Sequence, residues 1–184
     1  MKYSLYAQLR TIYETTVDNP HTFRVTCKMK DMIDQDILQK AVDLTMRRYP
    51  YFSMKIVREK DAVVFEQNTK EHIVIHGDGP ITLGSNEVNE HLLNVSWWKN
   101  KIHLDVYHAL TDGTGIYPLI KTLLYYYCSD YYQKELSSDN VRLSNHIVSK
   151  EEWIDPYKQK IDQELLLLKE KWNQPAFQIQ MDHN

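Results

Sequence analysis

The sequence predicts an α+β domain, in which strands and amphipathic helices follow one another along the chain. Residues 22–29, TFRVTCKM, alternate apolar and polar side chains with the period of a half-buried strand. Residues 34–49 carry apolar side chains at helical spacing instead. Further strands are expected as two hairpins, residues 51–57 with 62–66 and residues 92–98 with 101–108, and as a short segment at residues 72–75.

The first helix has clear start and stop signals. Asp34 is a favourable N-cap, and Ile33 and Leu38 can form a hydrophobic staple across it. The apolar spacing continues to Tyr49. Pro50 then ends the helix, because proline has no amide hydrogen to donate.

The strand at residues 101–108 leads through a loop into a second apolar helix. Leu104, Val106 and His108 share one face of this strand, so we expect His108 to point inward at the end of the apolar face. Helical spacing begins again at Ile116, and Pro118 is tolerated because it lies in the first turn.

The C-terminal third is more polar at first. Residues 134–150 are mixed and polar, and we expect a mobile loop there. Asp155 and Pro156 predict the start of a last helix. The ending AFQIQ, residues 176–180, is strand-like with no strand after it, which indicates a chain cut short.

Length and composition exclude several classes of protein. A chain of 184 residues is typical of one domain, and a net charge of −3 gives no footprint for nucleic acid. The N-terminus lacks the apolar run of a secretion signal, and no run approaches the roughly 20 residues that span a bilayer, so a soluble cytoplasmic protein is expected. Cys27 and Cys128 fit reduced, buried thiols and offer no metal site. The histidines at positions 72, 76 and 91 are expected at the surface or in loops.

One short segment carries a specific resemblance. YHALTDG, residues 107–113, resembles the HHxxxDG motif of acyltransferases with the chloramphenicol acetyltransferase and condensation-domain fold. Tyr107 stands at the first histidine, and His108 stands at the second, which is the catalytic one in that family. Asp112 and Gly113 complete the motif.

Two other segments agree with this resemblance. AQLR, residues 7–10, is similar to a segment near the family's N-terminus. RRYP, residues 47–50, followed by FSMKI, resembles the family's first helix and next strand. The branch that the chain resembles most is that of bacterial alcohol acetyltransferases.

The resemblance implies a fold and a domain organisation. We expect a two-layer α/β sandwich, a mixed sheet backed by helices, with residues 1–184 forming a single N-terminal lobe. Family members place the active site in a tunnel between two lobes. Residues 175–184 are then the start of a crossover to a missing second lobe. Self-association could replace that lobe, as in trimeric chloramphenicol acetyltransferases, which build the site between subunits.

The resemblance also implies roles for the motif residues. His108 is the expected general base that removes a proton from an alcohol or amine acceptor, and acetyl-CoA or another acyl-CoA is the expected cosubstrate, with no bound cofactor and no metal. Asp112 is expected to pair with an arginine and fix the loop, with Arg10 the first candidate and the arginines at positions 47 and 48 the next. Gly113 is expected to permit a tight turn. No donor for the oxyanion is assigned.

Several alternatives stay open at this point. A lone inward histidine is more often a core residue than a catalyst. A metal site of His108 and Asp112 would need a helix, whereas the TDGTG run predicts a loop. The same fold could also take its acyl group from a carrier protein, as condensation domains do, or serve as a binding or assembly module without chemistry.

Overall fold

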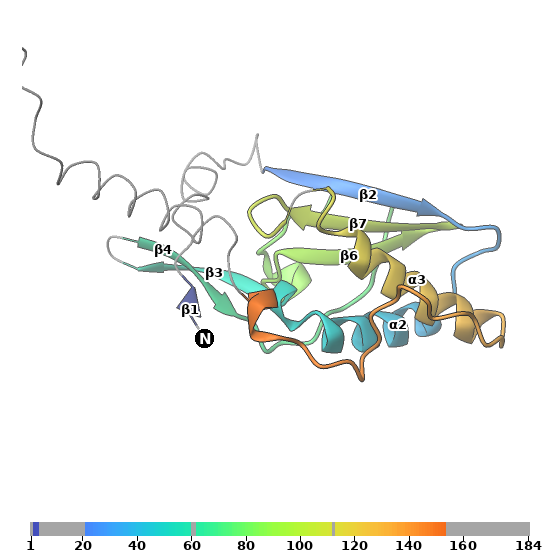
Figure 1. The fold of residues 1–184 in the computed structure, drawn as a ribbon. Helices are drawn as coiled ribbons and strands as arrows, with labels where there is room; N and C mark the ends of the chain where they lie inside the picture. The colour runs from blue at the N-terminus through green and yellow to red at the C-terminus, as the bar shows by residue number, and fades with distance from the viewer. Residues whose placement is uncertain (1, 4–20, 60–61, 112, 154–184) are drawn as a thin grey trace, which may run out of the picture.

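The structure, a computed structural model, describes residues 2–3, 21–59, 62–111 and 113–153 (Figure 1). A mixed sheet has the strand order β2-β7-β6-β5, and a smaller antiparallel sheet has the order β1-β4-β3. The strands are β1 (Lys2–Tyr3), β2 (Thr22–Lys28), β3 (Met54–Glu59), β4 (Ala62–Gln67), β5 (Ile75–His76), β6 (Leu93–Trp98) and β7 (Lys101–Tyr107). The helices are α2 (Gln35–Arg48) and α3 (Tyr117–Tyr131), with short 3-10 turns η1 (Pro50–Phe52), η2 (Asn86–Val88) and η3 (Lys150–Trp153).

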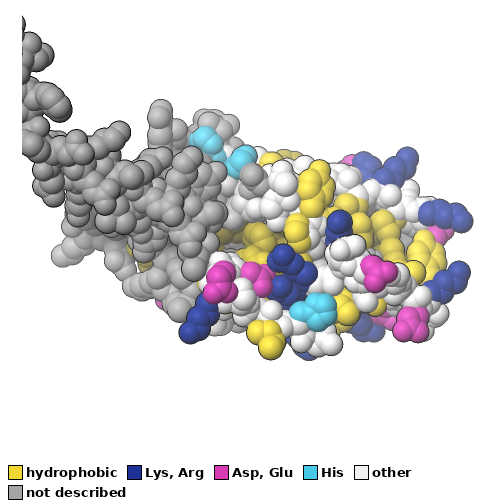
Figure 2. Space-filling model, viewed as in Figure 1, with side chains coloured by type: hydrophobic (Ala, Val, Ile, Leu, Met, Phe, Trp, Pro, Cys, Tyr) yellow, Lys and Arg dark blue, Asp and Glu magenta, His cyan; other side chains and the backbone are white. Residues whose placement is uncertain are grey.

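Both helices pack together on one face of the mixed sheet, which confirms the predicted α+β fold with a sheet backed by helices (Figure 1). Leu104 and Val106 of β7 are fully buried in the same core as Leu119 and Leu123 of α3. The sheet is mixed because β5 runs parallel to β6, whereas the other pairs are antiparallel. Charges of both signs are interspersed with apolar side chains on the face seen in Figure 2.

The start of α2 follows the predicted capping. The side chain of Asp34 accepts hydrogen bonds from the amides of Asp36 and Ile37 at 3.0 and 3.1 Å. Ile33 and Leu38 are both buried in the helix–sheet core, as the hydrophobic staple requires. The helix ends at Arg48, one residue before the predicted end, and η1 begins at the proline.

The predicted hairpins are confirmed, with strand ends that differ from the predicted ones by up to three residues. β3 pairs with β4, and β6 pairs with β7 through a tight turn at Lys99 and Asn100, where Lys99 is left-handed with a φ of 54°. The strand expected at residues 72–75 is only Ile75–His76. β2 lies antiparallel to β7, with Thr22 opposite Tyr107, so the start of β2 meets the end of β7.

Some predicted features lie outside the described residues: Arg10, Asp112, the helix from Asp155 and residues 175–184. Residues 134–149 carry no helix or strand, and η3 follows them. This segment is tied to α3, since the hydroxyl of Thr122 donates to the carbonyl of Arg142 at 2.8 Å. Its mobility stays a prediction. In the part of the chain that the structure describes, neither helix is long and apolar enough to cross a membrane.

Candidate functional site

The motif residues lie where β7 ends. Tyr107, the last residue of the strand, is buried, and its ring meets the ring of Phe65 edge-on at 6.4 Å. Tyr107 therefore fills the small core between the two sheets. His108, the next residue, is exposed. The expectation that His108 points inward is not met in burial, although its ring contacts Phe23, which is opposite Val106 in the sheet.

His108 is held from β2 in two ways. Its backbone amide donates to the carbonyl of His21 at 2.8 Å, which prolongs the β2–β7 pairing past the end of the strand. Its ring lies 5.2 Å from the ring of Phe23 in an edge-on arrangement. Phe23 itself packs against the helix–sheet core. The imidazole is thus exposed to solvent but attached to a rigid support.

The loop after His108 is short and anchored at both ends. Ala109 is buried, the amide of Leu110 donates to the carbonyl of Tyr107 at 2.9 Å, and Ile116 is fully buried. Gly113 is exposed, and a Cβ there would meet no described atom within 4 Å outside its chain neighbours. Its φ also lies outside the left-handed region. The role of Gly113 in a tight turn stays a prediction, since its neighbour Asp112 lies outside the described residues.

Asp112 and its first candidate partner, Arg10, both lie outside the described residues. Arg48, a later candidate, is buried and binds Glu152 instead, with its Nη2 2.9 and 3.0 Å from the two carboxylate oxygens. The pairing of Asp112 with Arg10 stays a prediction.

The second face of β7 carries a polar cluster around the buried residues His103 and Asp105, which the sequence analysis missed. Arg24 binds Asp105 through two nitrogens, at 2.7 and 2.8 Å. His103 lies between Thr26, 2.9 Å from its Nδ1, and Asp78, 2.9 Å from its Nε2. Burial and then the positive charge of Arg24 lower the pKa of His103 below its usual value. The alternation of β2 and β7 could have suggested these pairs, but only once their register was known.

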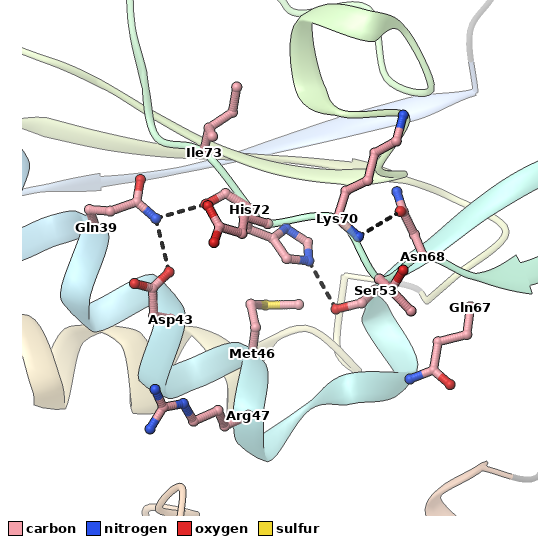
Figure 3. Close-up of a pocket in the computed structure, with 12 residues that line it drawn as sticks. Gln39, Asp43, Met46, Arg47, Ser53, Gln67, Asn68, Lys70, His72 and Ile73 are labelled. Atoms are coloured by element: carbon pink, nitrogen blue, oxygen red, sulfur yellow. Dashed lines mark hydrogen bonds between the residues drawn. The ribbon is translucent and has the colours of Figure 1, made fainter.

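A separate pocket of about 670 Å³ lies beside the outer face of α2 (Figure 3). No residue of the 105–115 segment lines it. His72 points into it, donating to or accepting from the hydroxyl of Ser53 at 2.9 Å, and its ring stacks on that of His91 at 3.6 Å. The lining residues are Gln39, Asp43, Met46, Arg47, Ser53, Gln67, Asn68, Thr69, Lys70, Glu71, His72 and Ile73.

The three histidines of this region lie at the surface or in loops, as expected, and one of them is buried. His91 lies in a loop, as expected, but it is fully buried rather than at the surface. Burial, and then the neighbouring His91, lower the pKa of His72 to about 3. His76 is exposed, as expected. The stacked pair is therefore a structural feature of the hairpin and the loop beneath it.

Comparison with known proteins gives the fold. No protein-family model matches the sequence, and no curated protein is similar to it. Among solved structures, the starter condensation domain of rhizomide synthetase RzmA is similar, with a TM-score of 0.62, 13% identity and coverage of 96% of this chain and 49% of that one. The epimerization domain of the third module of tyrocidine synthetase B has a TM-score of 0.63 at 14% identity, covering 97% of this chain and 45% of that one.

Two further structures widen this set. Polyketide synthase associated protein 5 from Mycobacterium tuberculosis has a TM-score of 0.51 and 17% identity, and the match covers 74% of this chain and 35% of that one. A variant of the RzmA domain in complex with C8-CoA has a TM-score of 0.56 and 12% identity, and the match covers 73% of this chain and 37% of that one. The chain spans about half the length of the condensation and epimerization domains it matches. Its fold is similar to that of about half of these condensation and epimerization domains.

Proposed function

We propose that this chain is the N-terminal lobe of an acyltransferase of the condensation-domain type, with His108 as the general base. The observation that carries the proposal is the position of His108. Its imidazole is exposed at the end of a buried strand, while its backbone is bonded to β2 and its ring rests on Phe23. A base must reach its substrate and keep its orientation, and this arrangement serves both needs.

The chemistry needs a group that accepts and returns one proton. The imidazole of His108 takes the proton from the acceptor's O–H or N–H while that atom attacks the thioester carbonyl carbon. When the tetrahedral intermediate collapses, the C–S bond breaks and the imidazolium gives its proton to the leaving thiolate. Histidine suits this exchange because its unperturbed pKa is about 6.5, near neutral pH.

The surroundings of the motif favour a fixed base. Tyr107 is locked in the core on one side of His108, and Ala109 is buried on the other. The backbone can therefore not shift without disturbing packed side chains. Such preorganisation is what a catalytic residue requires, since a small misplacement of the reacting atoms lowers the rate strongly.

The acyl donor and the acceptor are proposed more narrowly. We propose an acetyl group carried by CoA and a small alcohol or amine as its acceptor, on the sequence resemblance to alcohol acetyltransferases. The structure of an RzmA variant in complex with C8-CoA supports a CoA thioester as a donor for this fold. The alternative is an acyl group on a carrier protein, since several of the similar structures are condensation domains.

A second lobe would complete the tunnel. Because the chain covers about half of the condensation domains that it matches, we propose that another lobe, or a second copy of this chain, closes the site over His108. The exposed ring of Tyr117, at the start of α3 and near the motif loop, would lie on the side to be covered.

The test is thiol release from acyl donors in the presence of an alcohol and amine panel. Acetyl-CoA, octanoyl-CoA and an acylated carrier protein are compared, with the wild type, His108→Ala and the control His146→Ala, which removes an exposed loop histidine. Release that is lost only in His108→Ala supports the proposal. Equal release in all three proteins contradicts the role of His108, and no release from any donor favours a non-catalytic module.

A further inference from the structure

The residue opposite His108 has an unusual backbone. His21 precedes β2 and adopts a φ of 45°, in the left-handed region that side chains other than glycine rarely occupy. Histidine is among the few residues that tolerate this region, together with asparagine and aspartate. Backbone conformations of this kind cost free energy and cluster at functional sites, where the surrounding structure maintains them.

The consequence of this conformation is visible at His108. Thr22, the first residue of β2, is paired with Tyr107, so His21 just before the strand faces His108 just after β7. The carbonyl of His21 accepts the amide hydrogen of His108 at 2.8 Å. Two residues after His21, Phe23 supports the ring of His108. The start of β2 thus fixes both the backbone and the ring of the candidate base.

The Nε2 atom of the His21 imidazole makes no hydrogen bond to any described residue. This nitrogen is also buried. The contact of His21 with His108 is through the backbone carbonyl.

We propose that His21 is a positioning residue for His108: its left-handed backbone aims the carbonyl that holds the base's amide. This inference rests on the proposed acyl transfer for its effect on rate, but its structural part does not. A residue that cannot adopt the left-handed region should release the amide of His108, and residues that can adopt it should keep the bond.

The test compares His21→Val with His21→Asn and His21→Gly in the full chain. Valine is β-branched and disfavours a positive φ, whereas asparagine and glycine accept it. The matched control is Asn140→Val, because Asn140 is exposed and also left-handed, with a φ of 60°, but lies in the 134–149 segment. Amide exchange of His108, melting temperature, kcat and KM are measured for each.

His21→Val should speed exchange of the His108 amide about tenfold or more and lower kcat about tenfold with KM unchanged. In His21→Asn and His21→Gly, the exchange rate of the His108 amide and kcat should stay within about threefold of wild type. Asn140→Val should leave both quantities unchanged. Unchanged exchange in His21→Val overturns the inference. So does faster exchange spread evenly over β2 and β7, since His21 would then support only the fold. If the wild type transfers no acyl group, the proposed function fails, and the exchange data still decide the structural part.

Discussion

The guanidinium of Arg24 on β2 binds the carboxylate of Asp105 on β7 at two points, with Nε 2.7 Å from Oδ1 and Nη2 2.8 Å from Oδ2. The two residues are directly opposite in the sheet, and Asp105 is almost fully buried. The same guanidinium donates to the carbonyls of Asp78 and Gly79 at 2.6 and 2.5 Å. Arg24 therefore joins the sheet to the loop that covers its second face.

Removing this guanidinium should destabilise the fold. Arg24→Met leaves the carboxylate of Asp105 buried without its partner, and we expect the free energy of unfolding in urea to fall by about 2–3 kcal/mol. The double variant Arg24→Met/Asp105→Leu should lose less, because no unpaired charge remains. Lys70→Met, which breaks an exposed pair with Glu90, should change stability by less than about 1 kcal/mol. If Arg24→Met were as stable as the wild type, the pair of Arg24 and Asp105 would contribute nothing to the stability of the fold.

The contact between Arg48 and Glu152 should fasten η3 to the end of α2. The Glu152 carboxylate also accepts from Arg142 at 3.1 Å, from the hydroxyl of Tyr51 at 3.2 Å and from the amide of Ser149 at 3.1 Å. Glu152→Gln should therefore lower the free energy of unfolding by about 1.5–3 kcal/mol and speed amide exchange in η3. The exposed Glu135→Gln is the control and should be neutral. Equal stability of the two variants would contradict this account.

The stacked pair of His72 and His91 should make stability depend on pH. The pKa of His72 is lowered to about 3 by burial and by His91, so in the folded state it stays neutral at pH values where the unfolded chain, with an ordinary pKa of 6.5, takes up a proton. Stability is therefore fully present above about pH 6.5 and is lost as the pH falls toward 3. Because of His72, we expect the free energy of unfolding to fall by about 1–2 kcal/mol between pH 7 and pH 5.

Urea unfolding at several pH values measures this effect. His72→Gln removes the titrating ring, so its stability should fall less steeply than that of the wild type between pH 7 and 5. His146→Gln, which changes an exposed histidine, should keep the wild-type slope. Parallel curves for the wild type and His72→Gln would mean that the buried ring has no part in acid sensitivity.

Gly113 should tolerate a methyl group. The space around its Cβ position is open among the described residues, and its φ does not require glycine. Gly113→Ala should leave the melting temperature unchanged or raise the free energy of unfolding by about 0.4–1 kcal/mol, since alanine restricts the unfolded chain. A loss above about 1 kcal/mol would show that a glycine is needed there, as the motif resemblance suggested.

Local signals were sufficient for much of this fold. The capping of α2 by Asp34, the stop at Pro50 and the tight turn of β6–β7 depend on residues close together in the sequence, and each was predicted. The burial of residues at the ends of strands was predicted less reliably. His108 continues the apolar alternation of Leu104 and Val106, but it is exposed, and no local signal shows that the cover of this face ends before it.

Other parts of the site depend on contacts that are distant in sequence. The pairing of Arg24 with Asp105 joins residues 81 positions apart and requires the register of β2 against β7. The left-handed backbone of His21 lies beside the end of β7, a neighbour that is distant in the sequence, and the local sequence gave no prediction of it. His91 is buried because η2 and the loop around it fold over the small core, which a loop composition does not predict.

Chemical rescue at position 108 tests the central claim most directly. His108→Gly leaves an opening where the exposed imidazole lay, so the fold should persist with an unchanged melting temperature. In the wild type, acyl transfer from the best donor should proceed, and in His108→Gly it should fall by about 100-fold or more. Added imidazole should restore part of the rate in His108→Gly and none in wild type. A variant that transfers acyl groups at the wild-type rate, with or without imidazole, would contradict His108 as the general base.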